Sequence, residues 1–435
     1  MSAVVQFGST APHLARSMGR WALVGLMLSI VVGSSIFWQA GVVAGLVGRM
    51  SPWAYVAAAL GVGFIVVCTA EVASAFDAAG GPYLYAREAY GSFAGILVGW
   101  LLVLARIAAT ASFCGVLTAY LGTLWPAADH GAARVLLITL LIATSCAVNI
   151  RGVRESALVV SVATVAKLTP ILLFIFASGI LLLIHQTPLA AQPPVTAGFA
   201  EWAGAMMLTV YAYSGFESAL IPMSESSSPK RDAPFALLVT MSIAVFIYTG
   251  VQILVVLTLP DAASSKFAVI DAADHLLGHS WAVLLGAVPL LAAAGYIPAS
   301  ILAGARLPYA LAVRREFPAL FAKVHPRYRT PLVSIALFSL ATWVMAVAGT
   351  FIWAATLSVV ARLACYAAVC GCVLVFRHRG VPATRIRGAP FCALAGMAFC
   401  GLLAMRVDAI GLYAVMGVAS LALVTWFIAR KTTTP

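Results

Sequence analysis

Two short runs of small and polar residues interrupt long apolar segments of this 435-residue chain. The first is Gly33-Ser34-Ser35, inside segment 21–48, and the second is Tyr213-Ser214-Gly215-Phe216-Glu217, inside segment 201–224. Small polar residues weaken a helix interior. An interrupted helix frees N–H groups at one new end, which suit a carboxylate, and carbonyl groups at the other, which suit an ammonium. The two runs therefore predict a site for a small zwitterion, although such residues also occur where membrane helices pack closely.

Several charged side chains lie within the apolar segments, and four of them, Lys167, Glu217, Arg106 and Arg362, are candidates for a function. Lys167 has no acidic residue four positions away on either side, and burial disfavours the charged form of an amine. Glu217 directly follows the second interruption, and an ionised carboxylate in a membrane is expensive and usually functional. The alternatives are that Lys167 extends to the membrane surface and that Glu217 is a structural hydrogen-bonding group. We expect Arg106 to pair with Glu71 or Glu217, or to face the pathway; Arg362 is left unassigned.

The composition identifies the surroundings of these residues as a membrane. Hydrophobic residues make up 63% of the chain and charged residues 9%, whereas soluble proteins are about 25% charged. This excludes a soluble enzyme, a disordered chain and a nucleic-acid-binding protein. At about 20 residues per membrane helix, we predict an all-α integral membrane protein with one domain over 1–435 and about twelve spans: 21–48, 52–76, 92–123, 133–149, 155–184, 201–224, 234–258, 281–312, 331–348, 352–376, 389–405 and 410–429.

Basic residues indicate the orientation of these spans. With the N-terminus inside, eighteen Lys and Arg residues fall in inside segments and four in outside segments, namely Arg49, Arg134, Lys266 and Arg406. This asymmetry predicts that both chain ends are cytoplasmic in a cell membrane, and it explains the net charge of +12 without a polyanionic partner. The two interruptions are five spans apart, and five is odd, so the second five-helix unit enters the membrane from the opposite face.

Five stretches in this order are similar to motifs of the amino acid–polyamine–organocation permeases. They are Gly33-Ser34-Ser35-Ile36-Phe37, AEVASAFDAAGGPYLYAREAYG at 70–91, NIRGVRES at 149–156, YAYSGFESALIPMSESSSPKRDAP at 211–234, and ILAGARLPYALA with FPALFAKVHPRYRTP at 301–331. The resemblance implies the leucine-transporter-type fold of five plus five inverted helices. The repeats would cover about 20–184 and 201–376, and two accessory helices would occupy 389–429.

The resemblance and the helix interruptions assign the same binding site. Backbone N–H groups of Ser34 and Ser35 would bind the substrate carboxylate, and carbonyls near Ile30, Val31, Tyr211 and Ser214 would bind its ammonium, while the two serine hydroxyls could instead bond back within the helix. The predicted substrate-binding residues are Gly33, Ser34, Ser35, Ile36, Tyr211, Tyr213, Ser214, Gly215 and Phe216. The gate candidates are Trp38, Tyr296 and Ile297, each with core packing as its alternative.

The charged residues within the apolar segments indicate how transport is coupled to protons and which charge the substrate carries. The resemblance implies that Lys167 replaces the cation of sodium-coupled relatives, beside the first and eighth membrane helices. Lys167 and Glu217 are therefore the proton-coupling candidates. The only mid-span carboxylates are Glu71, Glu201 and Glu217, and two of them suit structural roles. A cationic substrate would need an unpaired carboxylate, so the sequence favours a neutral amino acid.

We therefore predict a secondary active transporter of amino acids that works by alternating access, with the amino acid, a proton and membrane lipid as its partners. The alternatives are an amino acid, organocation or polyamine exchanger and, from another class, a sensor or channel that binds without cycling. An enzyme is not expected, because no nucleophile–base pair falls within the spans. Neither a cofactor nor a metal is expected, because the eight cysteines lack ligand spacing. The oligomeric state is left open.

Overall fold

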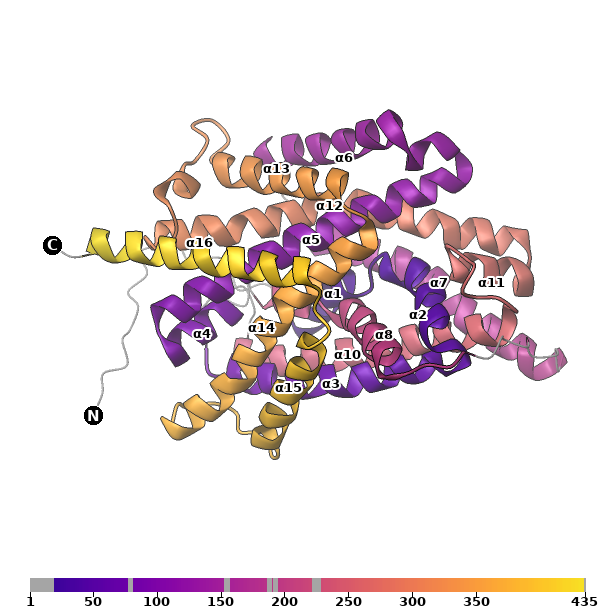
Figure 1. Cartoon of the computed structure of the whole chain (residues 1–435), viewed down its shortest axis with the longest axis horizontal. Helices are drawn as coiled ribbons and strands as arrows, with labels where there is room; N and C mark the ends of the chain where they lie inside the picture. The colour runs from indigo at the N-terminus through magenta and orange to yellow at the C-terminus, as the bar shows by residue number, and fades with distance from the viewer. Residues whose placement is uncertain are drawn as a thin grey trace.

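The computed structural model describes residues 19–76, 81–151, 157–185, 190, 195–220 and 228–433, and this part of the chain is helical without strands. Each of the twelve predicted apolar segments contains helix (Figure 1). The helices are α1 (Arg20–Val31), α2 (Ser35–Val47), α3 (Ser51–Ala73), α4 (Pro82–Tyr90), α5 (Ser92–Leu124), α6 (Gly131–Arg151), α7 (Ala157–His185), α8 (Phe199–Tyr213), α9 (Phe216–Ala219), α10 (Pro229–Thr258), α11 (Ala268–Leu277), α12 (His279–Val313), α13 (Leu332–Ala348), α14 (Phe351–His378), α15 (Ala389–Ala404) and α16 (Ala409–Thr433). Parts of the quoted motifs, 77–80, 152–156 and 221–227, lie outside the described residues.

Length and composition make these helices suitable for a membrane. In the described part, eight helical segments are long and apolar enough to cross one, and three shorter apolar helices, α1, α13 and α15, accompany them. Large apolar side chains are exposed on the outer helices, for example Leu140 on α6, Phe176 on α7 and Met416 on α16. A soluble monomer rarely exposes so many. These side chains therefore suit contact with lipid.

The centre of the bundle is formed by helices far apart in the sequence. α1 packs against α7 and α10, and α5 packs against α12 and α14. In Figure 1, α1 lies near the middle of the molecule, whereas α16 runs along one flank, where it packs on α5. The central helices are mostly buried, and they carry the interruptions on which the predicted site depends.

Both predicted helix interruptions are confirmed. α1 ends at Val31 and α2 begins at Ser35, while α8 ends at Tyr213 and α9 begins at Phe216. Gly215 has φ +108°, a backbone conformation that L residues with a side chain rarely adopt. A Cβ atom added there would lie 2.8 Å from Cγ2 of Ile30. Glycine at 215 thus allows the second interruption to lie directly against the end of α1.

Candidate functional site

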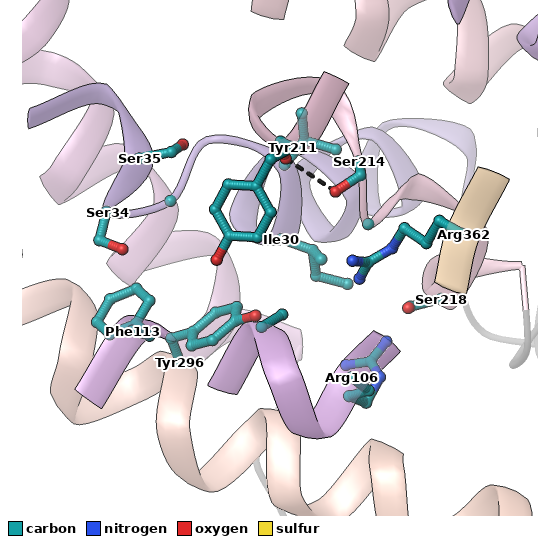
Figure 2. A pocket seen from close by; sticks show the side chains of 14 residues that line it. Ile30, Ser34, Ser35, Arg106, Phe113, Tyr211, Ser214, Ser218, Tyr296 and Arg362 are labelled. Carbon is teal, nitrogen blue, oxygen red and sulfur yellow. Dashed lines mark hydrogen bonds between the residues drawn. The ribbon is translucent and has the colours of Figure 1, made fainter. Parts of the chain in front are cut away.

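The two interruptions face one internal cavity (Figure 2). Its lining comes from α1 and α2, from the turn between α8 and α9, and from α5, α12 and α14. The lining residues are Ile30, Val31, Gly33, Ser34, Ser35, Arg106, Ala109, Phe113, Tyr211, Ser214, Gly215, Ser218, Tyr296 and Arg362. The space measures about 30 Å³, which holds about two water molecules. Side chains must therefore move before an amino acid can enter.

Hydrogen-bond donors hold the carbonyl end of the first interruption. The Lys167 ammonium on α7 donates to the Ser29 carbonyl at 2.6 Å. The Tyr248 hydroxyl on α10 donates to the Val31 carbonyl at 3.1 Å and lies 2.7 Å from the Ser35 hydroxyl. Lys167 is buried in this position, so it contacts α1 and does not extend to the membrane surface.

Two of the four carbonyls predicted to bind an ammonium already accept internal hydrogen bonds. Val31 accepts from Tyr248, and the Tyr211 carbonyl accepts from the backbone N–H and the hydroxyl of Ser214, at 3.2 and 2.8 Å. These bonds arise because a broken helix leaves carbonyls that must be satisfied in an apolar interior. Ile30 and Ser214 are the other two residues, and both line the cavity.

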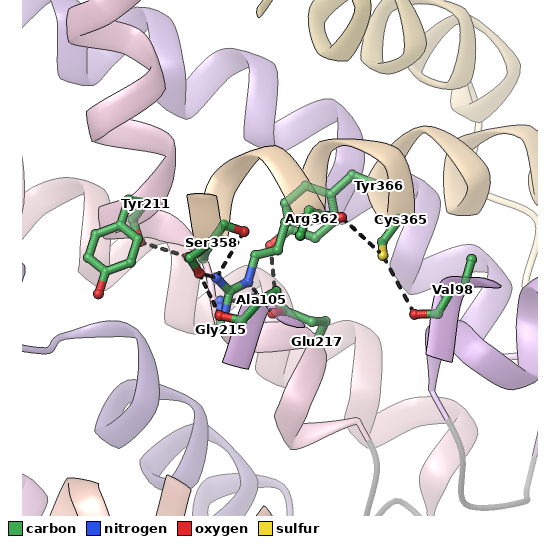
Figure 3. Close-up of polar contacts among 11 residues, drawn as sticks. Val98, Ala105, Tyr211, Gly215, Glu217, Ser358, Arg362, Cys365 and Tyr366 are labelled. Carbon is green, nitrogen blue, oxygen red and sulfur yellow. Dashed lines mark hydrogen bonds and ion pairs between the residues drawn. The ribbon is translucent and has the colours of Figure 1, made fainter. Parts of the chain in front are cut away.

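A carboxylate holds the second interruption (Figure 3). Glu217 accepts a hydrogen bond from the Gly215 N–H at 2.9 Å and another from the Tyr366 hydroxyl at 2.9 Å. Nε of Arg362, on α14, contacts the other Glu217 oxygen at 2.7 Å in a fully buried ion pair. Arg362 also bonds to the Ser358 hydroxyl. These bonds fit the structural alternative for Glu217, and they give Arg362 a partner that the sequence did not indicate.

Arg106 pairs with neither Glu71 nor Glu217 and faces the cavity, which was the alternative to pairing. Glu71 pairs instead with Arg377, through contacts of 2.6 and 2.7 Å, and Glu217 pairs with Arg362. Arg106 is 8% exposed and lines the cavity, and its Nη2 atom has no hydrogen-bond partner among the described residues. The third mid-span carboxylate, Glu201, accepts from the Gly198 N–H at the start of α8. The cavity therefore contains two guanidinium groups and no carboxylate in its described lining.

Some of the predicted site residues lie behind the cavity wall. Gly33, Ser34, Ser35, Tyr211, Ser214, Gly215 and Tyr296 line it, whereas Ile36, Trp38, Tyr213, Phe216, Ile297, Lys167 and Glu217 do not. The Tyr213 hydroxyl donates to the Tyr55 carbonyl at 3.3 Å, and Phe216 stacks on Tyr366. Tyr213 and Phe216 therefore support the wall from outside it.

Aromatic rings close one side of the cavity. Tyr296 stacks on Phe113, with ring centroids 4.5 Å apart, and both rings line the cavity. Trp38 packs edge-on against Phe351 at 5.2 Å, and neither of these two rings lines it. Phe113 on α5 and Ser218 on α9 were not predicted to line the site. No local pattern marks them, because an aromatic or a serine in an apolar helix is ordinary. Arg106 and Arg362, in contrast, were visible as charges within apolar segments.

The fold is that of a multi-span membrane protein with a central cavity, and the comparisons with known proteins identify its family. The sequence profile of an amino acid permease family matches residues 18–430, so the chain belongs to that family. An uncharacterised transporter of Mycobacterium tuberculosis is 29% identical, over 71% of this chain and 70% of its own length. The branched-chain amino acid permease of Bacillus subtilis is 24% identical, over 75% and 73%. The serine/threonine exchanger of Bacillus subtilis is 25% identical, over 74% of each chain.

Proposed function

We propose that this permease is a secondary active transporter that moves an amino acid across the cell membrane by alternating access, coupled to protons. The observation that carries the proposal is that two interrupted helices line one cavity. The N-terminus of α2, at Ser34 and Ser35, would bind the substrate carboxylate through backbone N–H groups. The carbonyls near Ile30 and Ser214 would bind its ammonium. Both chain ends would lie in the cytoplasm, as the distribution of basic residues indicates.

Lys167 is proposed to couple proton binding to the shape of α1. Its ammonium contacts the Ser29 carbonyl, one helical turn before the first interruption. A protonated lysine ties α7 to α1, and loss of the proton weakens this contact, because a hydrogen bond from a charged donor is stronger than one from a neutral amine. Release of the tie would free α1 to move between the inward-facing and outward-facing states. Glu217 would hold the second interruption unchanged through this cycle.

The cavity also limits the substrate. The sequence favours a neutral amino acid, and the described lining supports at least the exclusion of cationic side chains, because it presents Arg106 and Arg362 and no carboxylate. Like charges in a low-dielectric site repel strongly. Relatives named as a branched-chain amino acid permease and a serine/threonine exchanger agree with an amino acid substrate. Because one of these relatives is named an exchanger, amino acid exchange is the alternative to proton symport.

Uptake by purified protein in proteoliposomes tests the proposal. We expect a panel of labelled amino acids to include at least one whose uptake rises severalfold when the outside is made more acidic. In Lys167→Ala, uptake should no longer respond to the pH gradient, whereas the control Lys323→Ala, which replaces an exposed lysine, should behave as wild type. A Lys167→Ala protein that keeps the response would contradict the coupling role. Uptake that requires internal amino acid and ignores the gradient would favour exchange.

A further inference from the structure

Arg106 is a buried cation that forms no ion pair with a carboxylate in the described part of the chain. Its side chain projects from α5 and is 92% buried, since 8% of its surface is exposed. The Nη2 atom is buried without a hydrogen-bond partner among the described residues. A buried cation is costly unless a counter-charge and acceptors satisfy it. Arg106 lines both the main cavity and a second cavity that adjoins it beside Ser218 and Arg362.

The two carboxylates considered as partners of Arg106 already bind other groups. Glu217, which lines the second cavity, is held by Arg362, the Gly215 N–H and Tyr366. Glu71 receives two bonds from Arg377 and a third from the Ile386 N–H. The described linings of the two cavities thus hold two guanidinium groups and one carboxylate, which leaves one positive charge in excess. A ligand that enters the cavity can supply the missing negative charge.

The excess charge and the first helix interruption lie at opposite ends of the cavity. In Figure 2, Ser34 and Ser35 lie at the left of the cavity, and Arg106 lies at the lower right, below Ser218. An α-carboxylate at the N-terminus of α2 would therefore not satisfy Arg106 at the same time. A guanidinium presents parallel N–H donors that match a carboxylate in particular.

We propose that the substrate is an amino acid with an acidic side chain, whose second carboxylate binds Arg106. The α-carboxylate would occupy the N-terminus of α2 and the side-chain carboxylate would face Arg106 and Ser218. This inference rests on the proposed transport function and departs from the neutral substrate that the sequence favours. It also gives Arg106 its role: Arg106 selects the substrate, while Arg362 is neutralised by Glu217 and supports the second interruption.

Matched pairs of amino acids test the inference in proteoliposomes that contain the full chain. L-aspartate and L-glutamate are compared with L-asparagine and L-glutamine, which have nearly the same shape and lack the side-chain charge. For the wild type we expect kcat/KM for the acids to exceed that for the amides by about tenfold or more, because a bond to a charged group is worth more than one to a neutral group. Arg106→Gln should lose this preference, and Arg106→Lys should keep part of it. Arg306→Gln, at an exposed arginine of α12, should match wild type.

The outcomes separate this inference from the proposed function. Wild-type uptake of amides or other neutral amino acids in preference to the acids would overturn the acidic substrate and leave amino acid transport standing. An unchanged acid preference in Arg106→Gln would remove the role of Arg106. Uptake of no amino acid in a wider panel that includes serine and leucine would overturn the proposed function itself. If Arg106→Gln does not fold, the wild-type comparison of acids with amides still decides the substrate class.

Discussion

The two helix interruptions are held by groups of opposite chemical kind. At the first, a lysine and a tyrosine hydroxyl donate to the carbonyls of Ser29 and Val31. At the second, the carboxylate of Glu217 accepts from the N–H of Gly215. The second interruption differs further, because its Tyr211 carbonyl also accepts hydrogen bonds, from the N–H and the hydroxyl of Ser214. At both interruptions, therefore, the protein itself satisfies backbone groups that a broken helix would otherwise leave unpaired.

The two interruptions also differ in how firmly they are tied. Glu217 belongs to a network that joins α9 to α14 through Arg362 and Tyr366, and all of these groups are buried. The first interruption is held from α7 by Lys167 and from α10 by Tyr248, which contacts the Val31 carbonyl and the Ser35 hydroxyl, and no ion pair is found at it among the described residues. We infer that the second interruption is a fixed wall of the cavity and that the first is the part that moves. Substitutions at each interruption test this difference.

The largest loss of stability is expected when Glu217, which holds the second interruption, loses its charge. Glu217→Gln leaves Arg362 buried without its counter-ion, so the free energy of unfolding should fall by about 3–5 kcal/mol. Thermal unfolding of the purified protein in detergent measures the loss, with Glu88→Gln, at an exposed position of α4, as the control. The double variant Glu217→Gln/Arg362→Gln should lose less than the two single variants together. A Glu217→Gln protein as stable as wild type would show that the ion pair does not hold this wall.

A matched pair of glycines compares the two interruptions directly. Gly215→Ala should destabilise the protein by about 1–3 kcal/mol, because an alanine at φ +108° is strained and its Cβ would meet Ile30 at 2.8 Å. Gly33→Ala has no neighbour closer than the Ile30 carbonyl at 3.9 Å, so its stability should stay within about 0.5 kcal/mol of wild type. Thermal unfolding of the two purified variants in detergent measures both changes in stability. Equal effects of the two substitutions would remove the proposed difference between a close-packed wall and a looser one.

The smallest loss of stability is expected from removal of the Tyr248 hydroxyl at the first interruption. Tyr248→Phe removes the bond to the Val31 carbonyl and the contact with the Ser35 hydroxyl, at a cost of about 0.5–1.5 kcal/mol in stability. Because these contacts position the start of α2, KM for uptake should rise a fewfold as well. Tyr90→Phe removes a hydroxyl bond to the Ala368 carbonyl of α14, where neither residue lines the cavity, and should change stability without changing KM. A rise of KM in both variants would mean that uptake follows general stability.

The features that the sequence predicted are those that local chemistry decides. Apolar segments long enough to span a membrane form helices wherever they occur, and Gly33-Ser34-Ser35 and Ser214-Gly215 interrupt their helices through their own weak propensity. The contact of Lys167 with α1 was expected from a family resemblance, not from the residues around it. Lining residues such as Phe113 and Ser218 were missed, since nothing in their surroundings distinguishes them from packing residues.

The partners of the buried charges were decided only by the tertiary structure. Arg362 and Glu217 are 145 residues apart in the chain, and Arg377 and Glu71 are 306 apart. The sequence shows that a charge inside an apolar segment needs a partner, because burial penalises an isolated ion. It cannot show which of several carboxylates lies within reach, because that depends on how the helices pack. For this reason Arg106 was matched with carboxylates that other arginines hold, and its position in the cavity emerged only from the fold.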